Sequence, residues 1–128
     1  MRLKIIISAG EIVDKATILE IKANRITDGS KLADVLNELK ELTPPLNRIL
    51  LSNGDIKKLK DELFKVNSKL WDIENSIRAL EARKDFGTRF IKLARSIYIN
   101  NDKRSKLKNR INLLSGSVVK EVKEYSNY

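Results

Sequence analysis

Basic side chains are concentrated between residues 83 and 110, where ten Lys and Arg residues face only Asp85 and Asp102. On the helix expected there, six of them fall on one flank: Arg89, Lys92, Arg95, Lys103, Lys106 and Arg110. A stripe of this kind can neutralise phosphates, with an affinity that falls as salt rises. We therefore predict that these six residues bind nucleic acid or another polyanion. The alternative is a solvated helix flank with no ligand.

Aromatic side chains that could stack on bases are scarce. Tyr98, Tyr125 and Tyr128 are the only tyrosines, and two of them lie at the end of the chain. Backbone contacts should then dominate any nucleic-acid binding, and sequence preference should be weak.

Carboxylates at helical spacing offer a second kind of chemistry. Glu11 and Asp14 are three residues apart, which suits a hard cation or an acid and base pair. A structural explanation competes, because acids in a first helical turn favour the helix dipole. We expect Glu11 and Asp14 to form ion pairs along their own helix, with Lys15, Lys22 and Arg25, and we predict no metal site.

The composition removes the commonest catalytic groups. The chain has no His and no Cys, and it shows no glycine-rich phosphate loop. We predict no catalytic residue and no cofactor. The enzyme alternative is a small helical fold whose arginines clamp an anionic metabolite, by analogy with helical chorismate mutases. Its sequence support is a short pattern on one helix, formed by Asp72, Ile73, Ile77, Leu80 and Arg83.

A long apolar seam defines the elements that must position these groups. It steps by three and four residues, which keeps one stripe of a helix facing a partner helix. We predict a helix over about residues 56–84 from its members: Ile56, Leu59, Leu63, Val66, Leu70, Ile73, Ile77 and Leu80. Trp71, beside the seam, is expected to be in the core.

Two shorter helices are predicted before it. Ser8 and Glu11 have capping-box spacing, so a helix should run from about residue 9 to Thr27. A second helix should begin after Ser30 and reach a turn at residues 52–55, with Asp55 capping the next helix. The pair Pro44 and Pro45 predicts a kink or a restart capped by Thr43. The apolar stripe keeps its phase across the prolines, which favours the kink. Short connections then predict an all-α fold of two antiparallel helical hairpins in an elongated, coiled-coil-like bundle.

A fourth helix is predicted from the apolar stripe Phe86, Phe90, Leu93 and Ile97, and it has a polar interruption. Its stripe passes through Asn100 and Arg104 before Leu107, so either polar groups enter the core or the helix breaks, and we predict a break or hinge over residues 100–102. Residues 118–122 fit either a short helix or a strand that pairs with Ile5–Ile7, a minor pairing of the termini.

Length and net charge limit the kind of protein that this chain can be. The 128 residues fit a single helical domain over 1–128, and the formal net charge is +9, of which +8 lies in residues 65–128. No stretch reaches membrane-spanning length, so we expect a cytoplasmic protein with no membrane partner. Long seams also suit a protein partner or a homo-oligomer. The chain is predicted to be a non-enzymatic interaction module that binds proteins through helix faces and polyanions through its basic flank.

Several stretches resemble a known family. Residues 10–22 (GEIVDKATILEIK), 70–74 (LWDIE), 85–91 (DFGTRFI) and 93–98 (LARSIY), and the end of the predicted fourth helix, are similar to the DUF6165 type of short bacterial and phage proteins. The resemblance covers nearly the whole chain and implies no reaction. It implies only that a recurring pattern includes Glu11, Asp14, Lys15, Trp71, Asp72, Arg95, Asn101 and Asp102.

Overall fold

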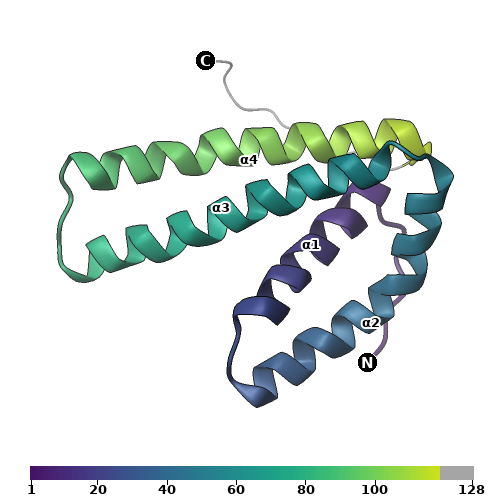
Figure 1. The fold of residues 1–128 in the computed structure, drawn as a ribbon, viewed down its shortest axis with the longest axis horizontal. Helices are drawn as coiled ribbons and strands as arrows, with labels where there is room; N and C mark the ends of the chain where they lie inside the picture. The colour runs from purple at the N-terminus through teal and green to yellow at the C-terminus, as the bar shows by residue number, and fades with distance from the viewer. Residues whose placement is uncertain (119–128) are drawn as a thin grey trace.

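Four helices make up the regular structure of residues 1–118, the part of the chain that the computed structural model describes. They are α1 (Ala9–Arg25), α2 (Gly29–Ser52), α3 (Ile56–Ala82) and α4 (Thr88–Ser115). The predicted all-α fold of two antiparallel hairpins is confirmed (Figure 1). α3 and α4 form the longer hairpin, and its turn projects beyond α1 and α2.

α1 is the central helix of the bundle, since it packs against all three others. Ser8 caps its first turn by accepting a hydrogen bond from the backbone N of Glu11, as the capping box predicts. The second half of that box is not used, because the Glu11 side chain pairs with Lys108 instead.

The apolar core lies where α1 meets α2, α3 and α4. The predicted seam residues Ile56, Leu59 and Leu63 are buried there against Val13 and Ile111. Trp71, predicted as core, is half-buried at the surface, with the Arg25 guanidinium 5.9 Å from its ring centroid. At that distance Arg25 and Trp71 are in cation–π contact.

α2 begins slightly earlier than predicted and continues through its prolines. Asp28, rather than Ser30, caps it by accepting from the backbone N of Lys31. Pro44 and Pro45 lie inside the helix, so the restart is excluded, and α2 bends along its length in Figure 1. Proline lacks the N–H that an interior helical position donates, which explains the bend.

Asp55 precedes α3 as predicted, but its side chain makes no capping hydrogen bond. The turn is held instead by Asn53, whose Oδ1 accepts from the backbone N of Asp55.

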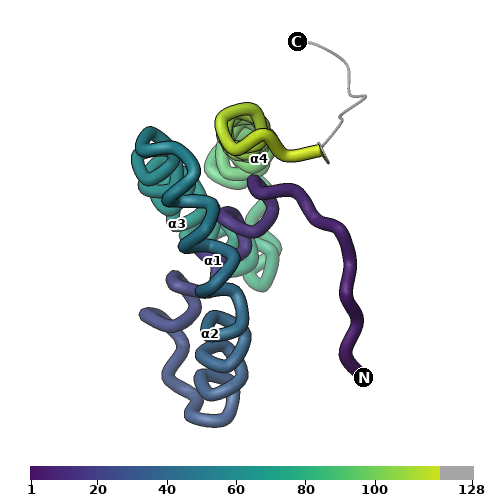
Figure 2. Tube along the Cα trace, turned by 90° about the vertical axis from the view of Figure 1, so that its right-hand side faces the viewer, coloured from purple at the N-terminus to yellow at the C-terminus, as the bar shows by residue number. Residues whose placement is uncertain are grey.

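Residues 1–7 form an exposed arm outside the helices, with no strand (Figure 2). The suggested pairing of Ile5–Ile7 with the tail involves residues 119–122, which lie outside the described part. Within residues 1–118, no helix has the length and apolar character needed to cross a lipid bilayer.

Candidate functional site

Gly10 brings the start of α1 into close contact with α4. A Cβ atom at this position would lie 2.4 Å from the backbone O of Lys108, which no side chain can tolerate. The backbone N of Gly10 donates to Oδ1 of the buried Asn112 at 2.6 Å. Glycine at this position therefore sets how closely α1 and α4 approach.

One turn later, Asp14 is the centre of a buried polar network. Its side chain accepts a bidentate pair of hydrogen bonds from Arg104, at 2.8 Å from Nε and 2.6 Å from Nη2. Asn67 of α3 donates from Nδ2 to Asp14 Oδ1 at 2.9 Å and to Thr17 Oγ1 at 2.8 Å. Asp14 is 2% exposed and Asn67 and Thr17 are also buried, whereas the Arg104 side chain remains 29% exposed. The network therefore joins α1, α3 and α4 around a buried carboxylate.

This network overturns the predicted break at residues 100–102. α4 is one continuous helix, and its polar positions enter the core, which is the alternative that the periodicity left open. Asn100 is buried and donates to the backbone O of Ser96. Arg104 is neutralised by Asp14, so neither residue needs an interruption of the helix to be satisfied.

The carboxylates of α1 do not pair along their own helix, so that prediction was wrong. Five ion pairs link α1 to the other helices. They are Glu11–Lys108 and Asp14–Arg104 to α4, Glu20–Lys60 and Arg25–Asp72 to α3, and Lys15–Glu38 to α2. Within residues 1–118, no three side chains of the Asp and Glu types gather in a way that could hold a metal ion.

The outer face of α4, which carries none of the cations paired with α1, is basic and exposed. The six predicted residues all lie in α4 and are all exposed: Arg89, Lys92, Arg95, Lys103, Lys106 and Arg110. At 100° per residue they share an arc of about 120°, along roughly 32 Å of helix. None of the six forms an ion pair with another residue in the described range. Asp102, the only acidic residue of α4, lies at the edge of this arc.

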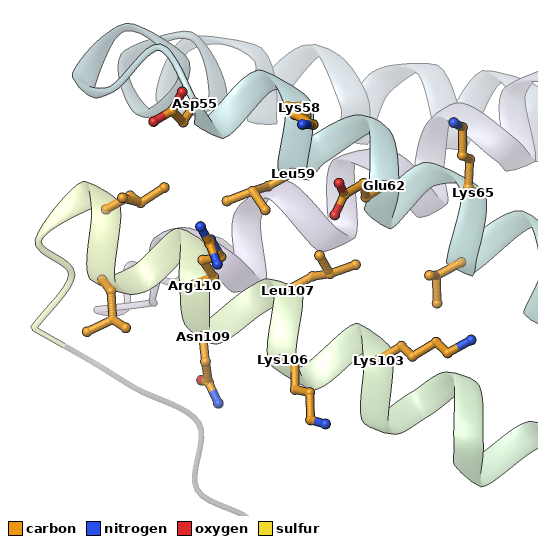
Figure 3. Close-up of a pocket in the computed structure, with 13 residues that line it drawn as sticks. Asp55, Lys58, Leu59, Glu62, Lys65, Lys103, Lys106, Leu107, Asn109 and Arg110 are labelled. Carbon is orange, nitrogen blue, oxygen red and sulfur yellow. The ribbon is translucent and has the colours of Figure 1, made fainter.

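A groove runs between α3 and α4 beside the C-terminal half of this face, with a volume of about 1130 Å³. Figure 3 shows Leu59 and Leu107 between the two helices, with lysines on both sides. Three of the six predicted basic residues line it, namely Lys103, Lys106 and Arg110. The other three, Arg89, Lys92 and Arg95, lie toward the turn between α3 and α4.

Two cations of the groove are not among the six predicted from the sequence. Lys58 and Lys65 of α3 line its other side. They are seven residues apart and next to seam positions, which places them on one face of α3. That spacing is a usable signal, but only the pairing of α3 with α4 shows which face it is.

A second, smaller pocket of about 420 Å³ lies between α1 and the α3–α4 hairpin. Trp71 and Asn101 line it together with two arginines, Arg78 and Arg104. Arg104 already gives two hydrogen bonds to Asp14, and Arg78 pairs with Glu74 and is largely exposed. The residues named for a chorismate-mutase-like pattern do not meet there, because Asp72 pairs with Arg25 and Arg83 is exposed at the end of α3.

Comparison with curated proteins and with solved structures finds no match. A family model described as "Family of unknown function (DUF6165)" matches residues 3–128. The matched range contains Gly10, Asp14, Arg104 and the six basic residues of α4. With nearly its whole length covered, the chain belongs to the DUF6165 family.

Proposed function

We propose that this protein is a non-enzymatic interaction module that binds a polyanionic partner through the basic face of α4. The observation that supports this most directly is the alignment of Arg89, Lys92, Arg95, Lys103, Lys106 and Arg110 on one exposed face of a continuous helix. A continuous α4 makes the alignment rigid, so the charges act together along the face.

The two faces of α4 differ in how their charge is compensated. Each cation of the inner face, Arg104 and Lys108, has a carboxylate partner on α1. The outer face has none within the described residues. Like charges held together on one face repel each other, and an anionic partner would relieve that repulsion while releasing counterions.

The test is fluorescence anisotropy of a labelled DNA oligonucleotide, single-stranded or duplex, titrated with the protein at about 50 and 200 mM salt. We expect salt-sensitive binding that is strongly weakened when Arg89, Lys92 and Arg95 are all changed to Gln. Each lost phosphate contact should reduce the salt slope by about one.

A charge-matched control is available on α2. Lys31, Lys40 and Arg48 are exposed, and changing them to Gln removes the same three charges from a helix other than α4. This control should keep most of the affinity. Absence of binding at low salt would contradict the proposal, as would equal losses in the two triple variants, which would mean that net charge alone attracts the DNA.

A further inference from the structure

The α3–α4 groove combines an aliphatic floor with cationic margins. Its floor is made of the apolar side chains Leu59, Val66, Leu107, Leu113 and Leu114. Leu113 is 70% exposed, so part of this floor faces solvent. A surface that serves only to bind phosphates gains nothing from exposed leucine.

The margins carry a net positive charge. The cations are Lys58 and Lys65 on α3, and Lys103, Lys106 and Arg110 on α4. Asp55 and Glu62 on α3 are the acidic lining residues, so five cations face two carboxylates. Cations border the apolar floor on both helices, as Figure 3 shows for Lys58 and Lys65 on one side and Lys106 on the other.

The dimensions suit a helix. From Asp55 to Val66 the groove follows about 17 Å of α3, which equals about three turns. An apolar groove between two antiparallel helices can bind the apolar face of a third, amphipathic helix.

Nucleic acid suits the groove less well. None of its lining residues is aromatic, so bases would find no ring on which to stack. Phosphates on the lysines would leave the aliphatic floor exposed to water or to polar sugar groups, whereas an apolar stripe would bury it.

We propose that this groove binds an acidic amphipathic helix of a protein partner, with aliphatic side chains on the floor and carboxylates at the lysines of both margins. This inference rests on the proposed function, because it names the class of anionic partner that the basic face receives. It adds to the electrostatic attraction an apolar contact that a simple polyanion lacks.

Two synthetic peptides test the proposal. The first, of about 18 residues, has leucines at i, i+3, i+4 and i+7 positions on one helical face and mainly glutamates elsewhere. The second has the same composition with its leucines spread around the helix. Fluorescence anisotropy should show the first peptide binding the full-length protein at least about tenfold more tightly, the change expected for burial of one leucine side chain.

A pair of leucine variants tests the floor without disturbing the core. Leu113→Gln should weaken binding of the amphipathic peptide about tenfold. Leu36→Gln, at a 50% exposed position on α2, should leave the affinity unchanged. Both variants should keep the circular dichroism spectrum of the unmodified protein.

The outcomes separate this inference from the proposed function. Equal binding of the two peptides would show that charge alone is recognised and would overturn the inference while leaving polyanion binding in place. Binding of duplex or single-stranded DNA in preference to the amphipathic peptide would overturn it in favour of nucleic acid. Failure of every anionic probe at low salt would contradict both proposals.

Discussion

The two faces of α4 both carry Lys and Arg side chains, but within the described residues those of the inner face are paired with carboxylates and those of the outer face are not. On the inner face, Arg104 and Lys108 each meet a carboxylate of α1 at 2.6 and 2.7 Å. On the outer face, six exposed cations have no carboxylate partner among residues 1–118. The difference teaches that basic composition alone does not define a binding surface. Paired and buried charge joins the helices of the fold, whereas the unpaired exposed charge is the part that we propose binds a partner.

The largest effect should come from leaving Asp14 buried without its partner. Removing one member of a buried ion pair typically costs 3–5 kcal/mol, because the remaining charge is neither solvated nor compensated. We expect Arg104→Met to lower the free energy of unfolding by about 3 kcal/mol, measured by chemical denaturation. Arg95→Met, on the outer face of the same helix, should change it by less than about 0.5 kcal/mol. Similar losses of unfolding free energy in Arg104→Met and Arg95→Met would show that cations of the inner face do not stabilise the fold more than cations of the outer face.

Gly10→Ala should have the next largest effect. The new Cβ would overlap the backbone of Lys108, which can move only if α4 itself shifts, and overpacking of this kind costs about 1–3 kcal/mol. Gly29→Ala is the matched control, since a Cβ there meets nothing within 4 Å and Gly29 is the first residue of α2, where the helix preference of alanine has little effect. Thermal unfolding should therefore show a lowered Tm for Gly10→Ala and little change for Gly29→Ala. A stable Gly10→Ala protein would mean that α1 does not need this close approach to α4.

The smallest effect should come from an exposed ion pair of α1. Lys15 and Glu38 are 2.8 Å apart, but their side chains are 53% and 46% exposed. Surface pairs contribute a median of about 0–1 kcal/mol. Glu38→Gln should therefore change the free energy of unfolding by less than about 0.5 kcal/mol in denaturant titrations. A loss as large as that of Arg104→Met would show that solvent exposure does not distinguish the Lys15–Glu38 pair from the Asp14–Arg104 pair.

Local patterns were enough to predict the elements of the fold. The seam from Ile56 to Leu80 predicted α3 and its packing against a partner, and Ser8 predicted where α1 begins. Both signals depend on residues a few positions apart, which is the range over which helical periodicity and capping act.

Errors about the caps of α2 and α3 were local, but the predicted break in α4 and the overlooked role of Gly10 came from contacts between residues distant in sequence. Asp14 and Arg104 are separated by 90 positions, so nothing near Asn100 indicates that a carboxylate will meet the polar stretch of α4. In the absence of that partner, a polar interruption in an apolar stripe is typical of a hinge. The need for glycine at position 10 was not predictable for the same reason, because it arises from close contact with the backbone of the distant residue Lys108.

The candidate site was partly predictable. The spacing of the six basic residues predicted their common flank on α4, and all six are exposed there. The lysines of α3 that share the groove with three of them were missed, since only the pairing of α3 with α4 shows that Lys58 and Lys65 face it.

We propose a division of roles in which the inner cations of α4 stabilise the fold and the outer cations bind an anionic partner. The most direct test of it substitutes one cation of each face, Arg104→Gln and Lys106→Gln, and makes the same two measurements on both variants. Each variant is titrated with denaturant and with labelled DNA or amphipathic acidic peptide at low salt. We predict that Arg104→Gln loses stability by about 3 kcal/mol and keeps most of its affinity, whereas Lys106→Gln keeps its stability and binds the anionic probe more weakly. Equal effects of the two substitutions on affinity, or a loss of stability in Lys106→Gln as large as in Arg104→Gln, would contradict it.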